Sequence, residues 1–246
     1  MRIQISFSGD CLPLYYRMGM LSIVKEALSQ SDESYFKRIF ESNNKMKPFG
    51  YAVYLKDFSF QDDIIKVSGF NMIVSSSDFE FMFHFHNGIQ KIKTIRYKEF
   101  KWTRENVRVL NEHPISSEKV LFKTLSPLLI ESKDGKPLSP TDKDYEKEFN
   151  YYSNLVVENM LNRSLHKRIK VTPLSMKKVV IKESNSKLID SGDNSQKIYF
   201  TAYKGYLMLE GHPDDLMCLY QNGSSKSRSY GFGLLDVEME RGEVVG

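Results

Sequence analysis

The chain has very little cysteine. Its 246 residues include two, Cys11 and Cys218, which stand about two hundred positions apart. Two thiols are too few for a cysteine-type zinc site or a disulfide framework, and such sparse usage is typical of proteins from a reducing compartment. We therefore expect a cytoplasmic protein without structural disulfides.

Long apolar runs are also missing. No stretch of about 18 consecutive apolar residues occurs, so we expect no membrane-spanning helix and no membrane partner. The segment Met1–Phe7 alternates like a strand and lacks the apolar core of a signal peptide. A hydrophobic content of 41% nevertheless predicts a folded globular protein.

The net charge of +4 is small, but its distribution is uneven. Segments 91–108 and 163–187 are rich in Lys and Arg, whereas segment 142–158 is acidic. A basic run is equally compatible with a solvated surface, so these segments permit a nucleic-acid partner without requiring one.

The first half of the chain has the order β-α-β-β-α-β. Alternating apolar residues predict strands, and apolar residues at helical spacing predict helices. The predicted strands are 2–7, 49–58, 64–75 and 102–111, and the predicted helices are 14–28, 34–40 and 79–89. This order is that of the ferredoxin-like split βαβ unit.

The second half repeats this order without detectable sequence identity. The predicted strands are 120–131, 169–183, 198–209 and 234–239, the predicted helices are 145–165 and 212–220, and a polar connection covers 185–196. We therefore predict an α+β fold of two tandem ferredoxin-like (βαββαβ) domains, residues 1–113 and 114–246.

A run rich in glycine and serine, Asn222–Gly233, precedes the last predicted strand, and we call it the glycine-rich loop. It has almost no apolar area to offset its ordering entropy, so we expect a loop that does not bury a core. Its glycines, Gly223, Gly231 and Gly233, allow close approach of a backbone or a ligand. Its cations, Lys226 and Arg228, suit a polyanion.

These features together resemble a known family. The tandem pattern, the segment Thr124–Pro127 that opens the second half and the Gly231–Gly233 tripeptide resemble the CRISPR-associated repeat-processing endoribonucleases. This is the sixth family of Cas proteins, within the repeat-associated mysterious protein superfamily. The resemblance implies an endonuclease without metal or other cofactor that cuts precursor CRISPR transcripts within their repeats. It also implies that the glycine-rich loop and the cleft between the domains hold the repeat RNA.

The chemistry implied by this resemblance begins with attack of a ribose 2′-hydroxyl on the adjacent phosphorus. The products are a 2′,3′-cyclic phosphate and a 5′-hydroxyl, and the protein assists proton transfer and stabilises the phosphorane. Many family members use a histidine after the first helix. Here the corresponding pair reads Phe36-Lys37, and the first histidine of the chain is His84.

Lysines are therefore the candidate catalytic residues. Lys37 and Lys47 lie in the expected region, and Ser22 on the first helix is a candidate assistant. A lysine, with an ordinary pKa of about 10.4, suits phosphorane stabilisation and leaving-group protonation better than it suits a base. We expect a slow endoribonuclease. Two alternatives stay open, namely a non-catalytic repeat-RNA-binding relative and an RNA-coating subunit of a CRISPR effector complex.

Further RNA contacts are expected from the basic run. Lys167, Arg168 and Lys170 lie at the start of a predicted strand, where side chains on one face can follow a phosphate backbone. His166 in the same run is a further RNA candidate. We expect no metal site, because the pair His84 and His86 lacks a third ligand.

Overall fold

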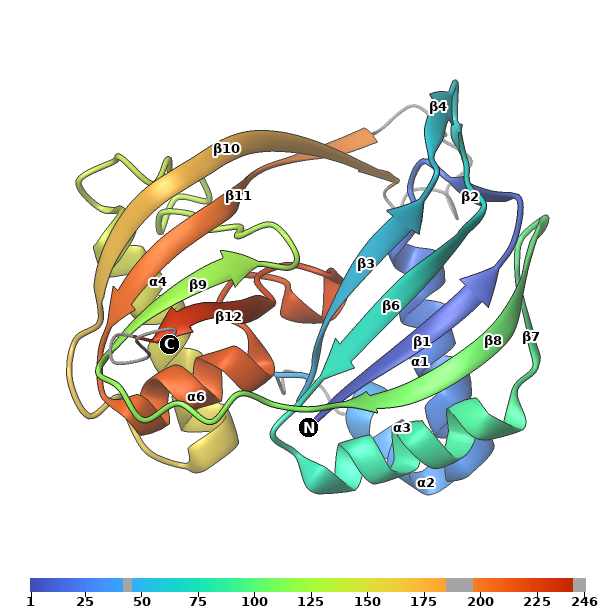
Figure 1. Ribbon diagram of the computed structural model, residues 1–246, viewed down its shortest axis with the longest axis horizontal. Coiled ribbons are helices and arrows are strands. Elements are labelled where there is room, and N and C mark those ends of the chain that lie inside the picture. Colours follow the sequence, from blue (N-terminus) through green and yellow to red (C-terminus); the bar gives the residue numbers. More distant parts are fainter. Residues whose placement is uncertain (42–45, 185–196, 241–246) are drawn as a thin grey trace, which may run out of the picture.

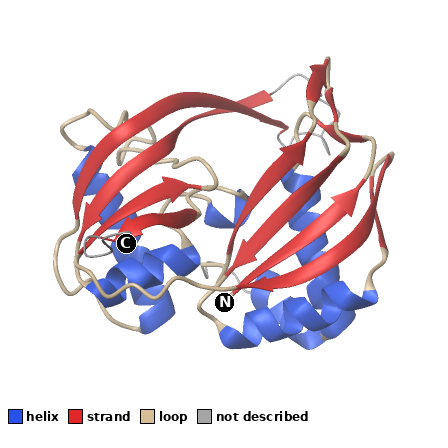
Figure 2. Cartoon of the chain, in the orientation of Figure 1, coloured by secondary structure: helices blue, strands red, loops and turns tan. Residues whose placement is uncertain are grey.

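The computed structural model describes residues 1–41, 46–184 and 197–240. The polar connection expected at 185–196 lies outside the described residues. Figure 1 shows two halves side by side, each built on an antiparallel sheet, and Figure 2 shows helices on one face of each sheet.

The first sheet has five strands in the order β3-β6-β1-β8-β7. Its first four members follow the strand order of a ferredoxin-like unit, and β7 is an additional edge strand that the sequence analysis missed. The strands are β1 (Arg2–Ser8), β3 (Gly50–Lys56), β6 (Gly69–Ser75), β7 (Thr94–Tyr97) and β8 (Phe100–Leu110).

Three helices cover one face of this sheet: α1 (Arg17–Ser31), α2 (Glu33–Phe40) and α3 (Phe79–Lys91). Two aspartates define where helices begin, because the Asp32 carboxylate accepts a hydrogen bond from the Tyr35 backbone N–H at 2.8 Å and Asp78 does the same for Phe81 at 3.0 Å. Between helices and sheet lies a buried core of aromatic and aliphatic side chains, among them Met20, Val24, Phe81, Phe85 and Trp102.

A small three-stranded sheet lies at the edge of this half. One of its strands takes up the beginning of a segment that was predicted as a single strand. Its order is β2-β5-β4, with β2 (Cys11–Pro13), β4 (Ser59–Gln61) and β5 (Ile64–Lys66). The predicted strand 64–75 is thus two strands, β5 and β6. Gly69, with φ of +145°, begins the second of them, and a Cβ at this position would lie 2.6 Å from the Phe7 carbonyl oxygen.

The second sheet has the order β10-β11-β9-β12, which is again that of a ferredoxin-like unit. Its elements are β9 (Lys119–Thr124), α4 (Tyr145–Leu161), β10 (Lys170–Ser184), β11 (Lys197–Glu210), α6 (Pro213–Asn222) and β12 (Leu235–Glu240). The predicted α+β fold with tandem ferredoxin-like units is confirmed, while the boundary between residues 113 and 114 stays a prediction.

The predicted strand 120–131 was too long. It ends at Thr124, and Leu128 makes an isolated bridge with Tyr203. Pro127 explains the early end, because proline has no backbone N–H to donate to a neighbouring strand.

Arg2 joins the two halves at the start of β1. Its side chain is buried, lies 3.7 Å over the Tyr220 ring and donates to the Asp236 carboxylate at 2.9 Å and to the backbone carbonyls of Tyr220 and Leu235. Burial lowers the pKa of this guanidinium. The two halves therefore share a fixed polar contact beside the glycine-rich loop.

Among the helices of the described ranges, none is long and apolar enough to cross a membrane.

Candidate nucleic-acid interface

The glycine-rich loop is largely buried, so the expectation of a loop without buried residues was wrong. Ser224, Ser225 and Arg228 are each at most 5% exposed. Hydrogen bonds fix the position of this segment and take the role that apolar contacts have elsewhere. The Ser225 hydroxyl accepts from the Leu129 N–H at 2.8 Å and donates to the Leu129 carbonyl at 3.0 Å, and the hydroxyls of Ser224 and Ser153 lie 2.8 Å apart.

Arg228 connects this loop to the N-terminal half. It begins a short 3-10 turn, η1 (Arg228–Tyr230), and its guanidinium donates to the Asn222 carbonyl at 2.6 Å and to the Lys47 carbonyl at 3.1 Å. Burial lowers its pKa to about 10, which leaves it cationic at neutral pH. These contacts give the Arg228 side chain a role in shaping the loop, and its predicted contact with RNA stays a prediction.

The three loop glycines are required by packing between protein segments. All have positive φ, between 75° and 78°. A Cβ at Gly231 would lie 2.7 Å from the Tyr51 ring, one at Gly233 would lie 2.2 Å from the Ser225 Cβ, and one at Gly223 would lie 2.6 Å from the Gly233 carbonyl oxygen. The close approach expected at these positions is therefore made by the protein itself.

The Thr124–Pro127 segment holds the far end of the same loop. The Leu234 N–H donates to the Ser126 hydroxyl at 2.9 Å, and the Gly233 N–H donates to the Pro127 carbonyl at 2.8 Å. The two motifs that carry the family resemblance thus form one structural unit.

Lys47 lies beside the glycine-rich loop in a cavity of about 320 Å³. Its ammonium group donates to the Ile39 carbonyl and lies 5.4 Å from the centre of the Phe40 ring. The cavity is lined by Met46, Lys47, Tyr152, Leu155 and the loop residues Ser225, Lys226, Ser227, Arg228 and Ser229.

Lys25 on α1 approaches Lys47, and the sequence analysis did not single it out. Its ammonium group lies 5.2 Å from the centre of the same Phe40 ring. Burial, with a smaller contribution from the charge of Lys25, lowers the pKa of Lys47. The sequence contained no signal that Lys25 lies near Lys47.

Lys226 also lines the cavity and forms an ion pair with the nearly buried Glu131 carboxylate. Of the predicted site residues in the described part of the chain, Lys47, Lys226 and Arg228 therefore come together around one cavity. Glu131 balances the charge of Lys226, and the loop backbone fixes where these side chains lie.

Other predicted residues lie elsewhere. Lys37 is exposed on α2, with its ammonium group 3.8 Å from the Glu33 carboxylate, and the Ser22 hydroxyl donates to the Gly19 carbonyl at 2.7 Å. Neither lines the Lys47 cavity. Both stay candidates from the sequence alone.

The basic run at the start of β10 is at the outer end of the second sheet, away from the first half (Figure 1). Each of its predicted RNA contacts has an acidic partner: Lys167 with Glu118 at 2.7 Å, Arg168 with Glu146 at 2.9 Å and Lys170 with Glu210 at 3.1 Å. Their role in RNA binding stays a prediction.

A second cavity, of about 590 Å³, lies between the halves. Tyr54 from β3, Phe58 from the following connection and Phe60 from the small sheet line one side, and their exposed fractions are 68%, 52% and 64%. Lys182 and Lys204 from the long β10–β11 ladder line the other side. We call this cavity the interdomain cleft. Its exposed aromatic residues were not predicted, although the alternation Phe58-Ser59-Phe60 at a strand edge was a usable signal.

An ion pair between halves lies at the edge of this cleft. The Arg17 guanidinium and the Glu183 carboxylate are 3.5 Å apart and their side chains are each 10% exposed. Burial raises the pKa of Glu183, and the nearby Arg17 opposes that shift. This contact links the start of α1 to the end of β10.

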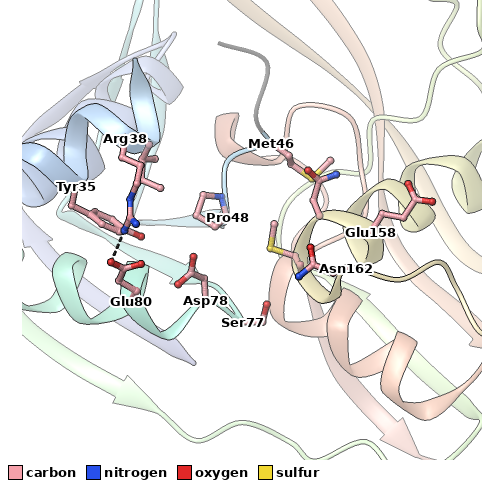
Figure 3. A pocket seen from close by; sticks show the side chains of 12 residues that line it. Tyr35, Arg38, Met46, Pro48, Ser77, Asp78, Glu80, Glu158 and Asn162 are labelled. Atoms are coloured by element: carbon pink, nitrogen blue, oxygen red, sulfur yellow. Dashed lines mark hydrogen bonds and ion pairs between the residues drawn. The ribbon is translucent and has the colours of Figure 1, made fainter. Parts of the chain in front are cut away.

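A third cavity, of about 600 Å³, lies on the helical side of the molecule and is acidic. Figure 3 shows Asp78 and Glu80 on one wall, Glu158 on the opposite wall, and Arg38 paired with Glu80. Its carboxylates disfavour a phosphate backbone. The positively charged candidate surface is therefore the Lys47 cavity together with the interdomain cleft.

Comparisons with solved structures agree with the observed architecture. A Cas6-related protein from Pyrococcus furiosus matches with a TM-score of 0.81 at 17% identity, covering 98% of this chain and 99% of that one. A RAMP protein described as binding different RNA substrates matches with a TM-score of 0.78 at 15% identity, covering 98% and 100%. A Thermus thermophilus Cas6 in a product complex matches with a TM-score of 0.65 at 12% identity, covering 96% and 98%.

No curated protein sequence matches the chain significantly. The structural likenesses show a fold of two tandem ferredoxin-like units. The family model of the C-terminal part of the CRISPR associated protein Cas6 matches residues 110–237, just over half of the chain. The chain belongs to the Cas6 family.

Proposed function

We propose that this protein is a metal-independent endoribonuclease that binds CRISPR repeat RNA and cleaves the precursor transcript. Membership of the Cas6 family supports repeat-RNA binding and processing. The observation that carries the catalytic part is the position of Lys47, which lines a cavity together with loop residues 225–229 and whose carbonyl accepts a hydrogen bond from Arg228.

In this proposal the scissile phosphate lies in the Lys47 cavity. The ribose 2′-oxygen loses its proton and bonds to phosphorus, the bond from phosphorus to the 5′-oxygen breaks, and the 5′-oxygen takes up a proton. Lys47, with Lys25 and Lys226 near it, stabilises the negative charge of the phosphorane, and Lys47 protonates the leaving oxygen. Water or RNA itself accepts the 2′ proton, so a slow reaction is expected.

The repeat strand enters this cavity through the interdomain cleft. Exposed Tyr54, Phe58 and Phe60 can stack on unpaired bases, while Lys182 and Lys204 face the same space. Stacking on aromatic residues tolerates any base, because every base has a π-face. The cleft therefore suits a single-stranded part of the repeat.

A non-catalytic RNA-binding role is the second candidate, either as a repeat-RNA-binding relative or as an RNA-coating subunit of an effector complex. One observation favours it: the ammonium group of Lys47 already donates to the Ile39 carbonyl. A cation engaged in this way can hold a phosphate without transferring a proton to the leaving oxygen.

The test is incubation of the protein with radiolabelled repeat RNA in EDTA. We expect cleavage at one site, products with 2′,3′-cyclic phosphate and 5′-hydroxyl ends, and no cleavage when the scissile nucleotide carries a 2′-deoxy substitution. Tight binding without cleavage would favour the second candidate, and several protein copies on each RNA would indicate the coating subunit. Cleavage of the 2′-deoxy RNA would exclude the proposed chemistry.

A further inference from the structure

Two histidines and an aspartate that are distant in the sequence come together at the outer end of the second sheet. His166 lies between α4 and β10, and His212 and Asp214 lie at the start of α6. One potential ligand atom from each lies within 4.8 Å of the others. The two imidazole rings are stacked, with centroids 4.0 Å apart. A metal site was not expected from the sequence, because nothing in the local pattern indicates that His166 lies next to His212.

The Asp215 carboxylate orients the His166 side chain. The Asp215 side chain is fully buried, and its carboxylate lies 3.1 Å from the His166 Nδ1 and accepts from the His166 backbone N–H at 2.8 Å. Arg163 donates to the same carboxylate and balances its charge. A proton held on Nδ1 by this carboxylate leaves the lone pair of Nε2 available, which is the usual arrangement of a metal-binding histidine with a carboxylate behind it.

His212 and Asp214 have a spacing that suits one ion. The His212 Nδ1 lies 3.7 Å from an Asp214 carboxylate oxygen. Two ligands at bond lengths of about 2.1 Å in a tetrahedral site are roughly 3.4 Å apart. Metal binding at the His212 Nδ1 would replace the long contact of 3.3 Å that this atom accepts from the Asp214 N–H.

We propose that His166, His212 and Asp214 bind a divalent transition metal ion of the zinc class. Two imidazole nitrogens and one carboxylate oxygen favour zinc, cobalt or nickel over magnesium, which prefers oxygen ligands only. The side chains of His166 and Asp214 are 41% and 70% exposed, so solvent can supply a fourth ligand.

The ion would connect the start of β10 to the start of α6. These elements are adjacent in space but separated in the chain, so binding to the folded state alone raises the melting temperature by mass action. The starts of β10 and α6 lie at the end of the second sheet away from the first half (Figure 1). The glycine-rich loop instead contacts the first half, where Arg228 donates to the Lys47 carbonyl. The inference is therefore independent of the proposed RNA cleavage.

The experiment uses tag-free protein that has been treated with EDTA and exchanged into chelator-free buffer. Zn²⁺ is titrated in competition with a chromophoric chelator, and Co²⁺ is titrated by visible absorption. We expect one equivalent of either ion to bind, Co²⁺ to show the absorption of a site with nitrogen and oxygen ligands, and Mg²⁺ not to compete. Zn²⁺ should raise the melting temperature.

Variants locate the binding. His166→Gln, His212→Gln and Asp214→Asn should each lower Zn²⁺ affinity at least tenfold and abolish the zinc-dependent rise in melting temperature. Asp214→Asn is nearly isosteric and exposed, so it leaves the metal-free fold intact, which the melting temperature without zinc verifies. His86→Gln, which removes a histidine from α3 in the other half, is the matched control and should bind as the unmodified protein does. Absence of one-to-one binding, or unchanged affinity in Asp214→Asn and His166→Gln, would overturn the proposal.

Discussion

The Arg228 guanidinium lies 3.1 Å from the Lys47 carbonyl oxygen, although 181 residues separate the two in the chain. This hydrogen bond joins the glycine-rich loop of the second half to the segment that carries the candidate catalytic lysine in the first half. The geometry of the candidate site therefore depends on a buried arginine that need not contact RNA.

Replacing Arg228 with Met should reduce both stability and cleavage. The carbonyls of Asn222 and Lys47 would lose their charged donor, and each buried acceptor without a partner costs roughly 1–3 kcal/mol. Urea unfolding measures the loss, and single-turnover cleavage at a temperature where the variant is folded measures the effect on the site. Full stability with normal cleavage would show that the loop does not depend on this contact.

Replacing Lys47 with Ala should lower the cleavage rate constant by about 10²–10³-fold, which is typical for loss of a group that stabilises transition-state charge. RNA affinity should fall much less, because other cations remain. The matched control is Lys37→Ala, which removes an exposed lysine of α2 that does not line the cavity. Equal losses in the two variants would contradict the assignment of Lys47.

The pH dependence of cleavage should report the pair Lys25 and Lys47. The folded pKa of Lys47 is lowered by burial first and by Lys25 second. For a lysine with a lowered folded pKa, the charged form is disfavoured in the folded protein, and this cost is relieved as pH rises past that pKa.

If protonated Lys47 is required, the cleavage rate should fall as the pH rises through the pKa of Lys47. Because that pKa is lowered, the fall should occur at a lower pH than it would for a lysine with an unshifted pKa. Lys25→Met should move that decline to higher pH, and Lys37→Met should not move it. The measurement is a single-turnover pH–rate profile with saturating RNA. A decline that stays in place in Lys25→Met would argue against coupling of the two lysines.

Gly231→Ala should destabilise the protein more than Gly135→Ala. Both glycines have positive φ, 78° and 74°, so alanine incurs a similar backbone cost of about 1–2 kcal/mol at each. A Cβ at Gly231 would also lie 2.7 Å from the Tyr51 ring, whereas at Gly135 the nearest atom is 3.9 Å away. Overpacking adds roughly 1–3 kcal/mol. Urea unfolding of both variants gives the difference, and equal values would refute the packing argument.

Phe60→Ala should weaken binding of single-stranded repeat RNA by about 1–3 kcal/mol if one base stacks on this ring. The folded state should be unaffected, because the side chain is 64% exposed. Phe79→Ala is the matched control, since Phe79 is 75% exposed on α3 and does not line the cleft. Fluorescence anisotropy measures both, and equal affinities would exclude Phe60 from the RNA path.

Periodicity and capping residues determined most of the secondary structure. Asp32 and Asp78 sit at the starts of helices, and alternating apolar residues marked β1, β3 and β12, because these signals act between residues close in the chain. The order of elements then sufficed to predict tandem ferredoxin-like units. The small sheet and the edge strand β7 were not predicted. Short strands are stabilised by pairing with neighbouring strands, and the local sequence does not indicate which strands pair.

The candidate site was partly accessible from the sequence. The glycine-rich loop was selected from its composition and Lys47 through the family resemblance, and the structure brings them to one cavity. Only the tertiary structure decided that Arg228 is buried, that Lys25 joins Lys47 and that His166 meets His212. Each of these follows from packing of segments far apart in the chain, where burial and charge depend on the partner and not on the local sequence.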